Sequence, residues 1–215
     1  MAIEQVNHVA LTLEEQLPIW LIVIPFVAAP LILLFGNKGL AWVISFLATV
    51  FSLAISVILV LTLKGGGVIS YHIGGWAPPI GIEYRIDATN ALILMLISLI
   101  ATVALPYAYR SVISEINPKH HTLFYASYML CFTGLMGIVV TGDAFNIFVF
   151  LEISSLATYI LVAMGAYKDK RALTAAYDYL ILGTIGATFF VIGIGFLYMA
   201  TGTLNLVDLA DRISD

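Results

Sequence analysis

Long apolar runs alternate with short polar segments along the whole chain. A helix crosses the roughly 30 Å of membrane hydrocarbon with about 20 residues, because each residue rises about 1.5 Å. Runs of this kind lie at 17–35, 40–63, 88–107, 122–141, 144–167 and 173–199. We therefore predict an all-α, polytopic membrane protein in which residues 1–215 form a single membrane domain with six spans.

The longest connection, between the second and third runs, is divided by glycine and proline. Gly65–Gly67 precede a partly alternating stretch of apolar and polar residues at 68–73, and Gly74–Gly75 follow it. Pro78–Pro79 then exclude a continuous helix. Alternation is typical of a strand, and glycine and proline are typical of turns, so we expect a small β-hairpin here. The tail at 203–215 is polar.

Basic residues are unevenly divided between the two sets of connections. The connections after the first, third and fifth runs contain six of them, namely Lys38, Arg110, Lys119, Lys168, Lys170 and Arg171. The opposite set contains Lys64, Arg85 and Arg212. Because cytoplasmic loops carry the excess of Lys and Arg, we predict that both termini lie on the outer side of the membrane.

The composition agrees with a membrane environment and narrows the possible functions. The chain is 61% hydrophobic and 10% charged, with a mean hydropathy of +1.04. Soluble domains average about 45–50% apolar and about 25% charged residues, so a soluble fold is excluded. A single cysteine, Cys131, cannot build a disulfide framework or a thiolate cluster. No cofactor fingerprint, metal-ligand cluster, nucleophile–base arrangement or nucleic-acid-binding patch is evident. We therefore expect a non-catalytic chain with no metal, cofactor or nucleic acid.

Two predicted spans contain an acid, and none contains Lys or Arg. Glu152 lies about 12 Å along the fifth span, near the middle of the membrane, and Asp178 lies about 8 Å into the sixth. An ionised carboxylate at the bilayer centre costs at least about 2.5–3.5 kcal/mol, so an acid there is paired, hydrated or protonated. We predict that Glu152 and Asp178 belong to a proton or ion pathway.

A structural role is the alternative for both acids. Glu152 could serve only as a hydrogen-bonding partner of a neighbouring helix. Asp178 could reach interfacial water or pair with the nearby basic residues at 168–171. This alternative is stronger for Asp178, because it lies closer to the end of its span.

The fifth span carries hydroxyl groups near Glu152. Ser155 and Tyr159 follow it by three and seven residues and so share its helix face, while Ser154 and Thr158 flank this stripe. These hydroxyls could hold water or satisfy a protonated carboxyl. They could equally be residues that pack one helix on another. We keep both interpretations.

Polar residues also mark the ends of the fourth span. Gly142 and Asp143 form a tight turn before the fifth span, and we expect Asp143 to cap that helix, with Asn146 beside it. His120 and His121 lie at the inner end of the fourth span. We interpret the two histidines as an interfacial pair, while the near-neutral titration typical of histidine leaves proton uptake at His121 open.

The segment Thr141-Gly142-Asp143-Ala144-Phe145-Asn146-Ile147-Phe148-Val149-Phe150-Leu151-Glu152 resembles the TGD-x-FN-x-[FY]-V-x-x-E signature of the antiporter-like subunits. Mrp-type Na⁺/H⁺ antiporters, membrane-bound hydrogenases and respiratory complex I share these subunits. The segments 75–87 and 172–183 also resemble the family, and the resemblance runs from about 17 to 213. It is greatest toward the Mrp D-type and hydrogenase H-type branch.

The resemblance implies a half-channel in which Glu152 pairs with a lysine on a broken seventh helix, in the plasma membrane of a prokaryote. The chain departs from the family in two respects. It contains six spans where family members have about fourteen, and Asp178 stands where several relatives carry lysine. We therefore expect partner membrane subunits, among them a chain that supplies the missing helices and the lysine opposite Glu152.

The function expected on these grounds is that of a membrane subunit of a complex that translocates H⁺ or Na⁺, with Glu152 as its central protonatable residue. The alternative is a non-conducting structural subunit, or the product of a split gene that only scaffolds the complex. A small transporter that acts alone is disfavoured, because six spans with two acids offer no counter-charge.

Overall fold

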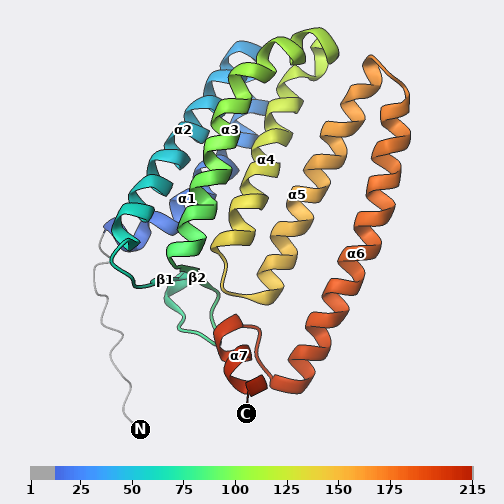
Figure 1. Cartoon of the computed structure of the whole chain (residues 1–215). Helices are drawn as coiled ribbons and strands as arrows, with labels where there is room; N and C mark the ends of the chain where they lie inside the picture. Colours follow the sequence, from blue (N-terminus) through green and yellow to red (C-terminus); the bar gives the residue numbers. More distant parts are fainter. Residues whose placement is uncertain (1–12, 215) are drawn as a thin grey trace.

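The computed structural model describes residues 13–214, and the side chains from residue 16 onward. Its long helices run up and down in a bundle (Figure 1). In chain order the elements are α1 (Leu13–Phe35), α2 (Lys38–Leu63), β1 (Ile69–His72), η1 (Ile73–Gly75), β2 (Glu83–Ile86), α3 (Ala88–Glu115), η2 (Pro118–His120), α4 (His121–Val140), α5 (Ala144–Met164), η3 (Gly165–Tyr167), α6 (Arg171–Thr201) and α7 (Leu206–Ser214). The six helices α1–α6 are long and apolar enough to cross a membrane, which confirms the predicted polytopic fold.

The predicted hairpin is present in the connection between α2 and α3. β1 and β2 pair antiparallel, with Ile69 opposite Ile86 and His72 opposite Glu83. The second strand comes after the glycine- and proline-rich turn. Its alternation is too short to stand out in the sequence. The hairpin, the 141–143 turn and α7 lie at the same end of the bundle, which we call the hairpin end (Figure 1). We call the opposite end the loop end.

Four helices, α1, α2, α3 and α6, extend beyond their predicted bounds by two residues or more, and α3 extends furthest. α3 runs to Glu115 rather than ending near Tyr107, and it takes in Arg110. The added segment is more polar, but it contains no helix breaker before Asn117 and Pro118, so the helix continues past the apolar run. α6 covers Arg171–Thr201 and ends at Gly202, whose φ of 73° is the left-handed conformation that favours glycine.

A further helix lies in the tail that the sequence marks only as polar. α7 begins after Asn205, whose side-chain oxygen accepts the backbone N–H groups of Val207 and Asp208, both at 3.1 Å. This is the usual arrangement of a helix N-cap. The apolar residues of α7 are spaced along one face, at Leu206, Leu209 and Ile213. Mean hydropathy does not reveal such a helix.

Burial is uneven across the bundle. In its most apolar stretch, α4 has 56% of its residues buried, whereas α5 has 17% and α6 has 11%. α4 packs against α1, α2, α3 and α5. α6 packs along α5, and its other main contacts are the short elements η3 and α7. The core is therefore formed by α1–α4, and the α5–α6 pair is attached at one edge (Figure 1).

Candidate functional site

α5 approaches α4 closely through two glycines. A Cβ atom built at Gly134 would lie 2.7 Å from the backbone oxygen of Phe150 and 2.7 Å from the backbone nitrogen of Ser154. A Cβ at Gly137 would meet the Phe150 ring in the same way. Small residues allow such backbone contact between membrane helices. This contact fixes which face of α5 points into the core.

Glu152 lies away from that contact. It is two residues, about 200° of helix rotation, from the buried Ser154, so its side chain points away from α4. Glu152 itself is half-buried, and Leu156, one turn further along, is 53% exposed. In the described part of the chain, no ion pair involves Glu152, and the four that are present join other residues. The acid therefore borders the uncovered side of the α5–α6 pair.

The hydroxyl groups predicted around Glu152 point in different directions. Thr158 donates to the Ser154 carbonyl at 2.7 Å, and its oxygen lies 3.4 Å from the Cys131 sulfur on α4. Tyr159 is buried on the other side, where its ring packs edge-on against Tyr179 of α6 and its hydroxyl lies over Gly183. Ser155 is half-buried. Thr158 thus packs α5 against α4, and Tyr159, two turns from Glu152 on the same face, packs α5 against α6.

Asp178 is exposed and lies on α6, a different helix from the one that carries Glu152. Its neighbours Tyr177 and Tyr179 are also exposed, and Tyr198 is exposed near the other end of the helix. Tyr177 and Tyr198 are separated by about 32 Å of helix, close to the roughly 30 Å hydrocarbon thickness. Tyrosines favour the interface, so we expect Asp178 to lie nearer the edge of the hydrocarbon than its middle.

Hydrogen bonds hold the turn at 141–143, which begins the signature segment, to both α5 and β2. Asp143 caps α5 as predicted, because its Oδ1 accepts the Asn146 N–H at 2.7 Å, and Asn146 donates to the Thr141 hydroxyl at 3.0 Å. Gly142 donates its N–H to the Glu83 carbonyl at 2.8 Å. A Cβ at Gly142 would lie 3.3 Å from that of Arg85, so glycine suits this close approach to β2. Burial raises the pKa of Asp143, and the N–H groups of its cap offset this only in part.

Glu83 on β2 is a buried carboxylate that the sequence does not single out. Its side chain is 5% exposed, and it accepts hydrogen bonds from the Ser70 hydroxyl at 2.6 Å and the Asn205 amide at 2.9 Å. Arg85 lies 3.5 Å away. Burial raises the pKa of Glu83, but the hydrogen bonds and the charges of Arg85 and His72 outweigh it, so the pKa is lowered from its usual value.

His121 has a local partner at the loop end. It is 3% exposed, and its Nε2 lies 3.1 Å from the Ile116 carbonyl at the end of α3. This contact joins the end of α3 to the start of α4, and it accounts for a buried histidine at this position. Among the described residues, no three His, Cys, Asp or Glu side chains lie close enough to hold a metal ion.

Residues 141–214, from the start of the signature turn to the end of α7, match the family model described as NADH:quinone oxidoreductase/Mrp antiporter, TM. NADH-quinone oxidoreductase subunit N of Desulforudis audaxviator is 40% identical over 201 residues, which are 92% of this chain and 39% of the relative. This chain belongs to the antiporter-like family of membrane subunits. Family membership thus confirms the resemblance carried by the signature around Glu152.

Other members of the antiporter-like family agree in sequence and in fold. The D-type subunit of the Na⁺/H⁺ antiporter of Alkalihalophilus pseudofirmus is 32% identical over 195 residues, which are 90% of this chain and 38% of that relative. In an archaeal respiratory membrane complex, the membrane-bound sulfane sulfur reductase, one chain superposes with a TM-score of 0.83 at 31% identity. The match covers 91% of this chain and 39% of that one. The chain thus spans about two fifths of the length of the relatives that it matches.

Proposed function

We propose that this chain is a membrane subunit of a proton- or sodium-translocating complex and that Glu152 is its central protonatable residue. The observation that carries the proposal is the placement of Glu152. It lies about 12 Å along α5, half-buried, on the side of the helix that faces away from the core. No ion pair within the described residues compensates its charge. A carboxyl group in this setting is suited to exchanging a proton with a mobile partner.

The proposal includes partner subunits. The uncovered face of α5–α6 and the share of the relatives that this chain spans both support further helices on that side. A basic residue on those helices would offset the charge of Glu152, because an opposite charge within a few ångströms favours ionisation. The complex would lie in a prokaryotic plasma membrane, with the hairpin end outside. Asp178 would act as an auxiliary acid near the inner surface.

The direct test is Glu152→Gln in the assembled complex, in inverted membrane vesicles. Gln keeps the size of the side chain but cannot release a proton, so we expect ΔpH formation or ²²Na⁺ movement to be almost abolished. Glu115→Gln is the matched control, because Glu115 is an exposed acid whose pair with Lys168 lies at the loop end. That variant should transport normally. Full transport by Glu152→Gln would overturn the proposal.

The second candidate is a structural subunit that conducts nothing, and the uncovered α6 favours it as well. The two candidates differ in what Glu152→Gln changes. A scaffold would lose neither transport nor assembly, whereas a conducting subunit would lose transport while the complex still assembles. Quantifying the assembled complex by native gel electrophoresis, beside the transport assay, separates the two.

A further inference from the structure

The α5–α6 pair is attached to the rest of the bundle very differently at its two ends. At the loop end the ion pair between Lys168 and Glu115 is exposed, with 64% and 50% of the side chains accessible. Such pairs contribute little to stability, because solvent screens them. At the hairpin end the attachment is buried and is made by hydrogen bonds. The position of α5 relative to the core is therefore set mainly by the contact with α4 and by the hairpin end.

Three segments that are distant in sequence meet at the hairpin end. Gly142 is bonded on one side to the Glu83 carbonyl, at 2.8 Å, and on the other to the Leu206 N–H, at 2.9 Å. The first N–H of α5, that of Ala144, donates to the Leu204 carbonyl at 2.8 Å. The turn that starts α5 is thus held between β2 and the segment that follows α6.

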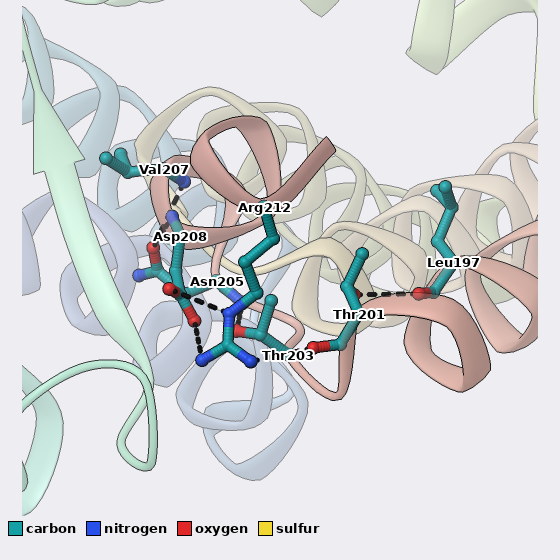
Figure 2. Close-up of polar contacts among 7 residues, drawn as sticks. All are labelled: Leu197, Thr201, Thr203, Asn205, Val207, Asp208 and Arg212. Carbon is teal, nitrogen blue, oxygen red and sulfur yellow. Dashed lines mark hydrogen bonds and ion pairs between the residues drawn. The ribbon is translucent and has the colours of Figure 1, made fainter. Parts of the chain in front are cut away.

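Glu83 and Asn205 complete this contact with their side chains. The Asn205 amide donates to Glu83 Oε2 at 2.9 Å across 122 residues of sequence, and its oxygen caps α7. Asn205 is 3% exposed. Figure 2 shows Asn205 beside the Asp208–Arg212 ion pair, in which the two side chains approach to 3.1 Å. We call Glu83, Gly142 and Asn205 the hairpin-end clamp.

We propose that Glu83 is a positioning residue for Glu152. Its backbone carbonyl holds Gly142, and its carboxylate holds Asn205, which keeps β2 and the segment after α6 against the first turn of α5. α5 carries Glu152 two turns further along. This inference rests on the proposed role of Glu152. A helix that slips by one residue moves its side chains by about 1.5 Å and rotates them by about 100°. Displacements of about 1 Å are large enough to change proton transfer between oriented groups.

The clamp lies beside charged and titratable groups on β1, β2, the turn before α5 and α7. Around Glu83 these are His72 on β1 and Arg85 on β2. The α5 turn contributes Asp143, which bridges to Asn205. α7 contributes Asp208 and its partner Arg212. A test that varies pH must therefore compare variants at each pH rather than rely on one profile.

The test uses two clamp variants, Glu83→Ala and Asn205→Ala, in the assembled complex in vesicles. A hydrophobic carbodiimide labels protonated carboxyl groups within the membrane, and mass spectrometry of the Glu152 peptide gives labelling as a function of pH. We expect the midpoint for Glu152 to shift by about one pH unit in both variants, the usual spread that environment produces in folded proteins. The pH optimum of transport should shift with it. Unchanged midpoints in both variants would overturn the inference.

Matched variants separate positioning from general damage. Ser70→Ala removes one hydrogen bond to Glu83 but leaves the contact with Asn205, so its midpoint should be close to that of the wild type. Glu83→Gln retains an oxygen that accepts from Asn205, and it should restore most of the effect of Glu83→Ala. If Glu83→Gln shifts the midpoint as far as Glu83→Ala does, the contact with Asn205 is not the cause and the inference fails.

A fourth variant covers the case in which the alanine variants do not assemble. Asn205→Asp places a second carboxylate against Glu83, so the clamp should be open at neutral pH and re-form on acidification, when one carboxyl is protonated. Its labelling should therefore differ from the wild type at neutral pH and approach it in acid. No difference at any pH would contradict the inference. Because labelling does not depend on ion movement, a transport-competent Glu152→Gln would overturn the proposed function without deciding this test.

Discussion

α4 and α6 are both transmembrane helices, yet the more apolar of the two is the less buried. The most apolar stretch of α4 has a mean hydropathy of 1.8 and is 56% buried, whereas that of α6 has 2.3 and is 11% buried. In a soluble protein the order would be reversed. In a bilayer, lipid tails are as apolar as leucine, so hydropathy shows that a helix is in the membrane but not which helices it contacts.

Small and polar residues distinguish the packed region instead. Ser45, Thr49, Ser52 and Ser56 form a fully buried row on α2. All four donate to carbonyls three or four residues earlier, as Ser45 does to Ala41 at 2.9 Å. A serine that satisfies its own hydroxyl in this way can be buried without another partner. Gly134 and Gly137 allow close packing of α5 on α4, whereas three of the four glycines of α6 have nothing within 4 Å of a built Cβ.

Glycine-to-alanine variants on α4 and α6 test this difference in packing most directly, and the largest effect on stability is expected on α4. Gly134→Ala should lower the free energy of unfolding by about 1–3 kcal/mol, because the added methyl would meet the backbone of α5. Gly193→Ala should be neutral or stabilising by up to about 1 kcal/mol, because nothing lies within 4 Å and alanine is the better helix former. Thermal unfolding of the purified protein in detergent measures both.

The same pair of variants tests whether the exposed face of α6 is covered in the complex. Equal effects of Gly134→Ala and Gly193→Ala on the isolated chain would contradict the packing described above. If Gly193→Ala is harmless in the isolated chain but reduces assembly of the complex, a partner helix occupies that face. If it is harmless in both, lipid covers the face.

Local patterns predicted most of the fold but only part of the candidate site. Run length gives the six spans, and the hydrogen bond from Asn146 confirms the predicted cap at Asp143. Glu152 stood out because an acid in an apolar run is costly in lipid. Whether Glu152 and Asp178 belong to a pathway stays a prediction. Their exposures differ, in the same order as the depths expected from the sequence: Glu152 is half-buried and Asp178 is exposed.

The hairpin-end clamp could not be predicted from local patterns. Glu83 lies among polar loop residues and is close to Arg85, so a solvated surface charge is the ordinary interpretation. Its burial depends on Asn205, 122 residues later, and on the turn at Gly142. Hydrophobic periodicity reports neighbours one turn or two residues away, not contacts at such separations. α7 was not predicted, because its apolar residues alternate with charged ones and are confined to one face.

Removing the N-cap of α5 should give the next largest loss of stability. Asp143→Ala should cost about 1 kcal/mol, whereas Asp143→Asn keeps the cap. The raised pKa of Asp143 means that the folded state holds this proton more tightly than the unfolded state does. Its contribution to stability therefore falls as pH rises from the usual 3.8 through the raised pKa, and Asp143→Asn removes this loss.

Glu83 should show the opposite pH dependence. Its lowered pKa gives a stabilising contribution that is full above the usual 4.5 and is lost as pH falls through the lower folded value. Unfolding of Asp143→Asn and Glu83→Gln between about pH 3 and 7 compares the two carboxyls directly. Parallel pH profiles for the two variants would show that their environments do not differ as described.

The smallest effect on stability is expected at α7, which belongs to neither of the two helices compared, α4 and α6. Arg212 pairs with Asp208 and also donates to the Thr201 carbonyl at the end of α6, at 2.8 Å. A nine-residue helix is marginal by itself, so Arg212→Gln should increase amide hydrogen exchange in 206–214 without changing the unfolding temperature of the bundle. Asp211→Asn is the control, because Asp211 is exposed on the same helix and is not part of this ion pair. If Arg212→Gln instead loosens the start of α5, α7 supports the hairpin-end clamp more strongly than its exposed ion pair suggests.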